Sequence, residues 1–128
     1  MPSTPALLDL GDEQFVSLTT FRKTGVRVAT TVWIARDGDA LLVTTPRGSG
    51  KVKRLRNNPR VELQPSSRMG TVADDAPIVA GNAEILHETP ALASVFRKKF
   101  GLQYVLFRAM EKLSKKRNVP HLILRITD

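Results

Sequence analysis

Residues Leu41 to Val61 read LLVTTPRGSGKVKRLRNNPRV. The apolar run at the start of this stretch predicts a buried strand, and small hydroxyl residues and glycines follow it in a polar turn. A short basic helix comes next and ends before Pro59, because the residue preceding a proline is pushed out of the helical region. We expect the rest of the chain to be organised around this strand, turn and helix.

The turn and the start of the basic helix have the composition of an anion-binding site. Amide groups at a helix start lack partners within the helix, and the helix dipole is positive at that end. Lys51 and Arg54 share one face of the helix, whereas Val52 and Leu55 share a face that can pack inward. The segment has neither the Walker pattern nor GxGxxG, so it is not a nucleotide-binding loop of those kinds. A solvated basic helix is the alternative interpretation.

The composition limits the possible ligands. With 128 residues, the chain is expected to form one domain, 1–128. It has 20 Lys and Arg against 12 Asp and Glu, a net charge of +8, so acidic ligands are favoured. The cations are concentrated at residues 47–60 and 97–117. No apolar run approaches the ~20 residues of a membrane helix, so we expect a cytoplasmic protein without membrane attachment.

Metal and thiol chemistry are not predicted. The chain has no cysteine, which excludes disulfides, thiolate ligands and cysteine nucleophiles. Its two histidines, His87 and His121, are isolated in the sequence, and we interpret each as structural or exposed. This lack of catalytic motifs is typical of enzymes in which a redox cofactor carries the chemistry.

The sequence patterns predict six strands, at residues 14–22, 26–36, 40–45, 61–65, 77–86 and 120–126. Gly81-Asn82 predicts a bulge or kink. Residues 2–13 form an arm with a helical turn, and helices are expected at 90–100, opened by Thr89-Pro90, and at 102–116. The second of these has an apolar stripe that should pack inward, comprising Val105, Leu106, Ala109, Met110 and Leu113. Hairpin-linked strands followed by late helices favour a mainly β, α+β antiparallel barrel.

The order of these motifs resembles the split β-barrel flavin and deazaflavin oxidoreductases, the family that includes pyridoxine phosphate oxidase. The resemblance is carried by LTTFRKTG at 18–25, TTVW at 30–33, LVTT at 42–45 and SGKVKRLRNNPRV at 49–61. The resemblance extends over nearly the whole chain, and the motif sequences are most similar to those of the actinobacterial branch that uses coenzyme F420, a deazaflavin. It implies a six-stranded, FMN-binding-like split barrel that forms a homodimer, with cofactor in the clefts between subunits.

The resemblance also implies two cofactor-binding segments. In the first, Lys51 with Thr45 and Ser49 matches the positions that hold the cofactor phosphate, and Lys53 and Arg54 assist there or meet the acidic tail of coenzyme F420. In the second, the positions alongside the ring are Thr30, Thr31, Val32 and Trp33. Thr44 completes the polar turn, which gives the full set Thr30, Thr31, Val32, Trp33, Thr44, Thr45, Ser49, Lys51, Lys53 and Arg54.

Two departures argue against pyridoxine phosphate oxidase activity itself. The oxidase branch has a basic residue on the second strand, where this chain has Ala29-Thr30-Thr31, with Arg27 the nearest cation. The C-terminal Trp and Arg of that branch are also missing. The function implied is therefore hydride transfer between coenzyme F420 and a small organic acceptor whose identity the sequence does not define.

Several alternatives stay open at the level of sequence. FMN could replace the deazaflavin, and a flavin- or haem-binding module without turnover belongs to the same family. A nucleic-acid-binding barrel is disfavoured, because no aromatic residue lies between Arg47 and Arg60. No catalytic residue is identified, and a proton could come from solvent or from Tyr104. Trp33 is either a core residue or a wall of the ring pocket, and Arg68 is either a solvated turn residue or a contact to the cofactor tail.

Overall fold

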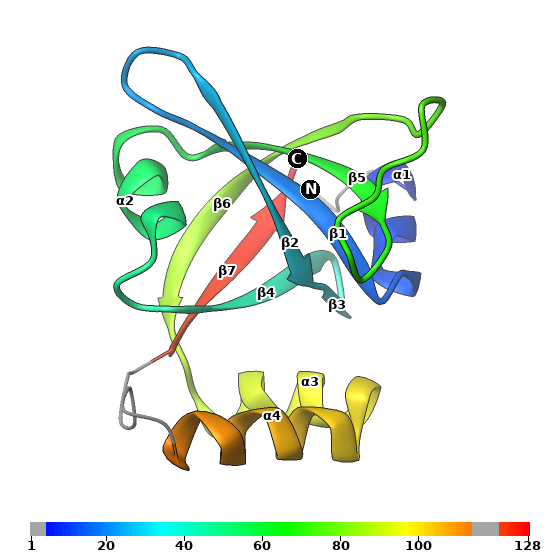
Figure 1. The fold of residues 1–128 in the computed structure, drawn as a ribbon, viewed down its shortest axis with the longest axis vertical. Coiled ribbons are helices and arrows are strands. Elements are labelled where there is room, and N and C mark those ends of the chain that lie inside the picture. Colours follow the sequence, from blue (N-terminus) through cyan, green and yellow to red (C-terminus); the bar gives the residue numbers. More distant parts are fainter. Residues whose placement is uncertain (1–4, 114–120) are drawn as a thin grey trace.

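The computed structural model describes residues 5–113 and 121–128, which form a curled sheet with helices around it (Figure 1). Its strands are β1 (Phe15–Phe21), β2 (Arg27–Trp33), β3 (Ala35–Asp37), β4 (Ala40–Pro46), β5 (Arg60–Ser66), β6 (Val79–His87) and β7 (His121–Thr127). Its helices are α1 (Pro5–Asp9), the short 3-10 helix η1 (Leu10–Asp12), α2 (Gly50–Asn57), α3 (Pro90–Phe100) and α4 (Leu102–Leu113). The predicted helical residues 114–116 and strand residue 120 lie outside the described residues.

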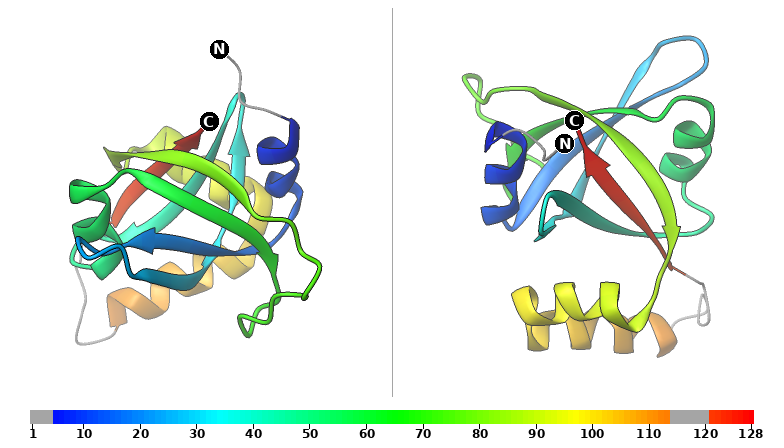
Figure 2. Two further views of the ribbon diagram at one scale, coloured as in Figure 1. Left: turned by 90° about the horizontal axis from the view of Figure 1, so that it is seen from above. Right: turned by 180° about the vertical axis from the view of Figure 1, so that it is seen from behind.

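The two edges of the sheet are joined by a single residue. The strand order is β2-β1-β5-β6-β7-β4-β3, with every neighbouring pair antiparallel, so β2 and β3 are the edge strands. Only Ile34 separates these two strands in the sequence. The sheet must therefore curl until its edges meet at that point, as Figure 2 shows from two further directions. This confirms the prediction of a mainly β protein with a split-barrel fold.

The prediction of six strands was wrong, because residues 26–36 form two strands. Trp33 pairs with Phe15 of β1, whereas Ala35 pairs with β4 on the other edge. Ile34 between them is fully buried. A run of apolar and β-branched residues does not reveal a change of pairing partner, because both strands require the same residue types.

Of the bulge or kink predicted at Gly81-Asn82, the bulge is not found, since β6 pairs in unbroken register with β5 and then with β7. The strand instead changes partner at Asn82, which pairs with Arg60 of β5 and with Thr127 of β7. A Cβ atom at position 81 would lie 2.8 Å from the carbonyl oxygen of Thr127. Gly81 is therefore needed for the close approach of two backbones.

Helix α2 covers one end of the barrel. Its inward side chains are Val52 and Leu55, as the sequence predicted, and both are buried. Leu55 joins the main core, whose strand residues include Val16, Leu18, Val43, Leu63 and Leu124. The packing of α2 against this core holds the residues at its N-terminus in place beside β4.

Helices α3 and α4 lie side by side on another face of the barrel (Figure 1). The side chain of Thr89 accepts a hydrogen bond from the Leu92 amide at 3.2 Å, so the predicted start of α3 is confirmed. Phe96 and Phe100 pack with Tyr104 in a second core cluster. The aromatic residues of the two helices thus form a layer against the barrel.

The inward stripe predicted for α4 was wrong for its residues up to Met110, and the side chain of Leu113 lies outside the described part of the structure. Val105, Leu106 and Met110 are exposed by 47%, 54% and 69%, whereas Tyr104 is buried. The helix presents its aromatic residues to the barrel and leaves aliphatic side chains on its outer face. The periodicity of the sequence located an apolar face on α4, but it could not show which face of the helix packs against the rest of the protein. In the described part of the chain, no helix is long and apolar enough to span a membrane.

Lys99 connects three segments of backbone at the point where the sheet edges meet. Its ammonium donates hydrogen bonds to the carbonyl oxygens of Gly11 and Ile34, each at 2.7 Å, and to that of Glu13. Burial lowers the pKa of Lys99, and Asp12 and Glu13 oppose that shift. One side chain of α3 therefore fastens η1 and the β2–β3 junction together.

We predict that Lys99→Met lowers the free energy of unfolding by about 1–3 kcal/mol, because three carbonyl groups lose their donor. Urea denaturation followed by circular dichroism measures the change. Lys98→Met is the matched control, since Lys98 is exposed and should change the stability by less than about 0.5 kcal/mol. Equal stability of the two variants would show that the Lys99 contacts contribute nothing.

Candidate cofactor site

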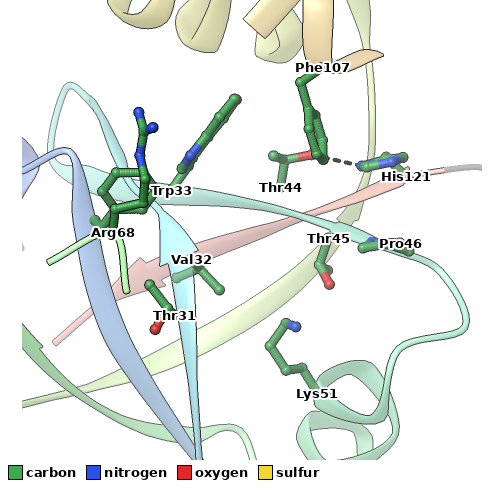
Figure 3. A pocket seen from close by; sticks show the side chains of 11 residues that line it. Thr31, Val32, Trp33, Thr44, Thr45, Pro46, Lys51, Arg68, Phe107 and His121 are labelled. Carbon is green, nitrogen blue, oxygen red and sulfur yellow. Dashed lines mark hydrogen bonds between the residues drawn. The ribbon is translucent and has the colours of Figure 1, made fainter. Parts of the chain in front are cut away.

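A pocket of about 300 Å³ lies between β2, β4, the start of α2 and the face of α4 (Figure 3). Six of the residues predicted to bind cofactor line it. They are Thr31, Val32, Trp33, Thr44, Thr45 and Lys51. The two sequence segments assigned separately to a ring and to a phosphate therefore border one cavity, which is within the size range of small-molecule sites.

Lys51 provides the cation of this pocket. Figure 3 shows its side chain extending from α2 toward Thr45 and the cavity. Burial lowers the pKa of Lys51, and repulsion by the Arg54 guanidinium lowers it further. Among the described residues, no carboxylate lies within ion-pair distance of Lys51. A partly buried cation without a counter-ion is suited to binding an anionic ligand.

Hydroxyl groups border the same end of the pocket. The Thr45 and Ser49 hydroxyls lie 3.0 Å apart, and Thr45 is fully buried. This contact joins the end of β4 to the residue that precedes α2. The Thr44 hydroxyl lies 3.1 Å from Nδ1 of His121. These contacts keep the polar turn in a fixed shape around Lys51.

Aromatic side chains form the apolar wall opposite. Trp33 stacks on Phe100 with ring centroids 4.7 Å apart, and its ring also lies 5.1 Å from that of Phe107 and 6.5 Å from that of Phe15. Trp33 is therefore both part of an aromatic cluster and a wall of the pocket, so the two interpretations of this residue are compatible. The wall gives a planar ligand an apolar surface on which to stack.

Four of the predicted residues do not line the pocket. The Thr30 hydroxyl donates to the Leu18 carbonyl at 3.5 Å, and the Ser49 hydroxyl hydrogen-bonds with that of Thr45, which does line the pocket. Lys53 is exposed on the outer side of α2. Arg54 donates from Nε to the hydroxyl of Thr20 at 2.6 Å and so serves the packing of α2 against β1. Sequence spacing placed these residues near the site but could not show where their side chains point.

Five lining residues were outside the predicted set of cofactor contacts, although Arg68 was considered as a contact to the cofactor tail: Phe15, Pro46, Arg68, Phe107 and His121. Our interpretation of His121 as structural or exposed was incomplete, because this histidine is buried and also borders the pocket. Pro46 directly follows the predicted Thr44 and Thr45, so proximity could have identified it. Phe107 and His121 come from late segments that only the three-dimensional fold brings to β2.

Among the described residues, no group of three or more metal-ligating side chains occurs. Tyr104, considered as a proton source, is buried and lies outside the pocket lining. Its hydroxyl accepts a hydrogen bond from Arg108 at 3.0 Å, and burial raises the pKa of Tyr104. The site is therefore a stacking surface with hydroxyls and cations around it.

Comparison with known proteins identifies the family of the chain. The sequence pattern described as pyridoxamine 5'-phosphate oxidase matches residues 4–127. The chain belongs to the pyridoxamine 5'-phosphate oxidase family. No curated protein matches it. Membership confirms the family resemblance deduced from the sequence motifs.

Solved structures share the fold of this family member. An F420 reductase is 21% identical with a TM-score of 0.60, and the match covers 95% of this chain and 90% of that one. A conserved hypothetical protein from Mycobacterium tuberculosis is 24% identical with a TM-score of 0.63, covering 99% and 81%. The haem storage protein HutZ from Vibrio cholerae is 11% identical with a TM-score of 0.65, covering 99% and 90%. At these identities the comparison establishes the fold alone.

We predict that binding of phenyl phosphate weakens as the pH rises from about 8 to about 10, where the phosphate is already dianionic. Only the ammonium form of Lys51 attracts the anion, and its lowered pKa brings deprotonation to a lower pH than for an ordinary lysine. Isothermal titration calorimetry measures the affinity. In Lys51→Arg the charge persists, so the decline should be much smaller. An equal decline in both proteins would exclude Lys51 as its cause.

Proposed function

We propose that this protein is an oxidoreductase that binds coenzyme F420 and transfers hydride between the deazaflavin and a small organic acceptor. The observation that carries the proposal is the partly buried Lys51 without a counter-ion, placed in the same pocket as the Trp33 wall. FMN and coenzyme F420 each combine a phosphate with a planar ring. The phosphate would lie at Lys51 and the ring along β2. Family membership supports a cofactor of this general type.

The residues present fit such a cofactor. Lys51 would hold the phosphate with the buried hydroxyl of Thr45, while Val32 and Trp33 would border the ring. The bound cofactor supplies the hydride, and the protein supplies orientation and exclusion of water. Lys53 is exposed beside this end of the pocket and can meet the acidic tail of coenzyme F420, whereas Arg54 is engaged with Thr20.

FMN is the alternative cofactor, because it too carries one phosphate on a planar ring system. Similarity to an F420 reductase supports the deazaflavin as cofactor. Similarity to the haem storage protein HutZ supports a haem-binding module without turnover as a further alternative. Parallel titrations with coenzyme F420, FMN and haemin, followed by Trp33 fluorescence, test the proposal. Preferential binding of coenzyme F420 supports it, and preferential binding of FMN or haemin contradicts the choice of cofactor.

We predict that Lys51→Ala weakens binding of coenzyme F420 by about 1.5–3 kcal/mol, the range for a hydrogen bond to a charged group. Fluorescence titration measures the dissociation constant. Arg56→Ala is the matched control on the same helix, and we expect it to change the affinity by about 0.5 kcal/mol or less, because its side chain is exposed and outside the pocket. An unchanged affinity in Lys51→Ala would remove Lys51 from the site.

We also propose that the protein acts as a homodimer with the cofactor in the cleft between subunits. Helix α4, which contributes Phe107 to the pocket, has an exposed apolar stripe. Leu102, Leu106 and Met110 are exposed by 70%, 54% and 69%, and their spacing of four residues places them on one face of the helix. An exposed apolar stripe of this kind is typical of a surface that another protein covers.

We predict that Leu106→Glu converts the dimer to a monomer, because a charge would have to be buried in the interface. Sedimentation equilibrium at several concentrations measures the mass. Lys98→Glu, on the exposed side of α3, should leave the dimer intact. A wild-type protein that is monomeric at micromolar concentration would contradict the proposed assembly.

A further inference from the structure

The pocket has cations on two opposite sides and no acid between them. Among the described residues that line it, two are basic and none is Asp or Glu. Figure 3 shows Lys51 on one side and Arg68 on the other, with Thr31 and Val32 between them. A ligand, or two ligands side by side, should therefore carry anionic groups at both ends of an apolar centre.

Arg68 is held at the rim by a structured turn. The Gly70 amide donates to the Ser67 carbonyl at 3.0 Å, and the Thr71 amide donates to the Ser67 hydroxyl at 3.0 Å. Gly70 has a φ of +86°, and a Cβ atom there would lie 2.9 Å from the Thr31 hydroxyl. The turn thus rests directly on β2, and only glycine allows that approach.

The guanidinium of Arg68 has an aromatic support but no acidic partner. Its Cζ lies 5.8 Å from the centroid of the Phe15 ring, and Phe15 also borders the pocket. In the described residues, no carboxylate lies within ion-pair distance of Arg68. A guanidinium stacked on an aromatic ring keeps its N–H edge available for a carboxylate.

The covalent structure of coenzyme F420 indicates which anionic group would lie at Arg68. In coenzyme F420 the acidic tail follows the phosphate, so the tail begins at Lys51 and leads away from the ring. Arg68 lies at the opposite side, beside Trp33 (Figure 3). The interpretation of Arg68 as a contact to the tail therefore does not suit its position, and the second reactant is the molecule that must stack near the ring.

We propose that the acceptor is a planar unsaturated or aromatic acid whose carboxylate is held by Arg68. This inference rests on the proposed function, because it assigns the Lys51 side to the cofactor phosphate. Phe15, which supports the Arg68 guanidinium, offers an apolar surface to the planar part of the acceptor beside the cofactor ring, and Arg68 selects the acid and orients it. Neutral analogues of the same shape keep the stacking but lose the charge-assisted hydrogen bonds.

The test uses two flat probes of the same shape, 2-naphthoate and naphthalene-2-carboxamide. Calorimetry measures their binding to protein loaded with coenzyme F420, or with FMN if that cofactor binds instead. We expect the wild type to bind the acid about tenfold or more tightly than the amide, and Arg68→Met to lose that preference. Arg68→Lys, which keeps the charge, should retain part of it.

Two results would overturn the proposal. One is equal affinity of the wild type for the acid and the amide, and the other is a tenfold loss of cofactor affinity in Arg68→Met, which would place Arg68 on the cofactor. If neither cofactor binds, the proposed function fails separately. In that case the naphthoate titration is done on the free protein, where a loss of affinity in Arg68→Met but not in Lys51→Met supports an acid site at Arg68, and the reverse contradicts it.

Discussion

The fold depends on the hydrogen bonds that Lys99 donates where the two edge strands meet. The chain passes from one edge of the sheet to the other through Ile34, which lies outside both strands and whose carbonyl takes a hydrogen bond from a side chain. Lys99 donates to the Ile34 carbonyl and ties it to η1. Its neighbour Phe100 stacks on Trp33. The same helix thus holds both the barrel junction and the wall of the pocket.

The charge of Lys51 in the pocket suits ligand binding and does not add to the stability of the fold. Lys51 is partly buried beside Arg54, an arrangement that disfavours the charged form and lowers its pKa. Such a group adds nothing to the stability of the free protein, since its desolvation is not offset by an ion pair. An anionic ligand would supply the missing counter-charge. The same lysine that does not stabilise the free protein would therefore stabilise the complex.

That Thr44, Thr45 and Lys51 border one pocket could be predicted, because they are close together in the sequence. Thr44, Thr45 and Lys51 lie within one strand, turn and helix, and the proline at position 59 and the inward Val52 and Leu55 define the geometry of that helix. The direction of the Arg54 side chain, toward Thr20, could not be predicted from the sequence, because it depends on a contact with β1. The outer face of α4 was misassigned for a related reason, since apolar periodicity does not distinguish a face that packs in the core from an apolar face that stays exposed.

The other side of the pocket is assembled from segments far apart in the chain. Phe15, Arg68 and Phe107 belong to β1, to the turn after β5 and to α4, and only the pairing of β1 with β2 and β5 and the packing of α4 bring them together. Residues on such a side can change without disturbing the strand, turn and helix that hold Lys51. The two sides can therefore vary independently, and under the proposed function the local unit would keep the type of cofactor while the assembled side would adapt to different acceptors.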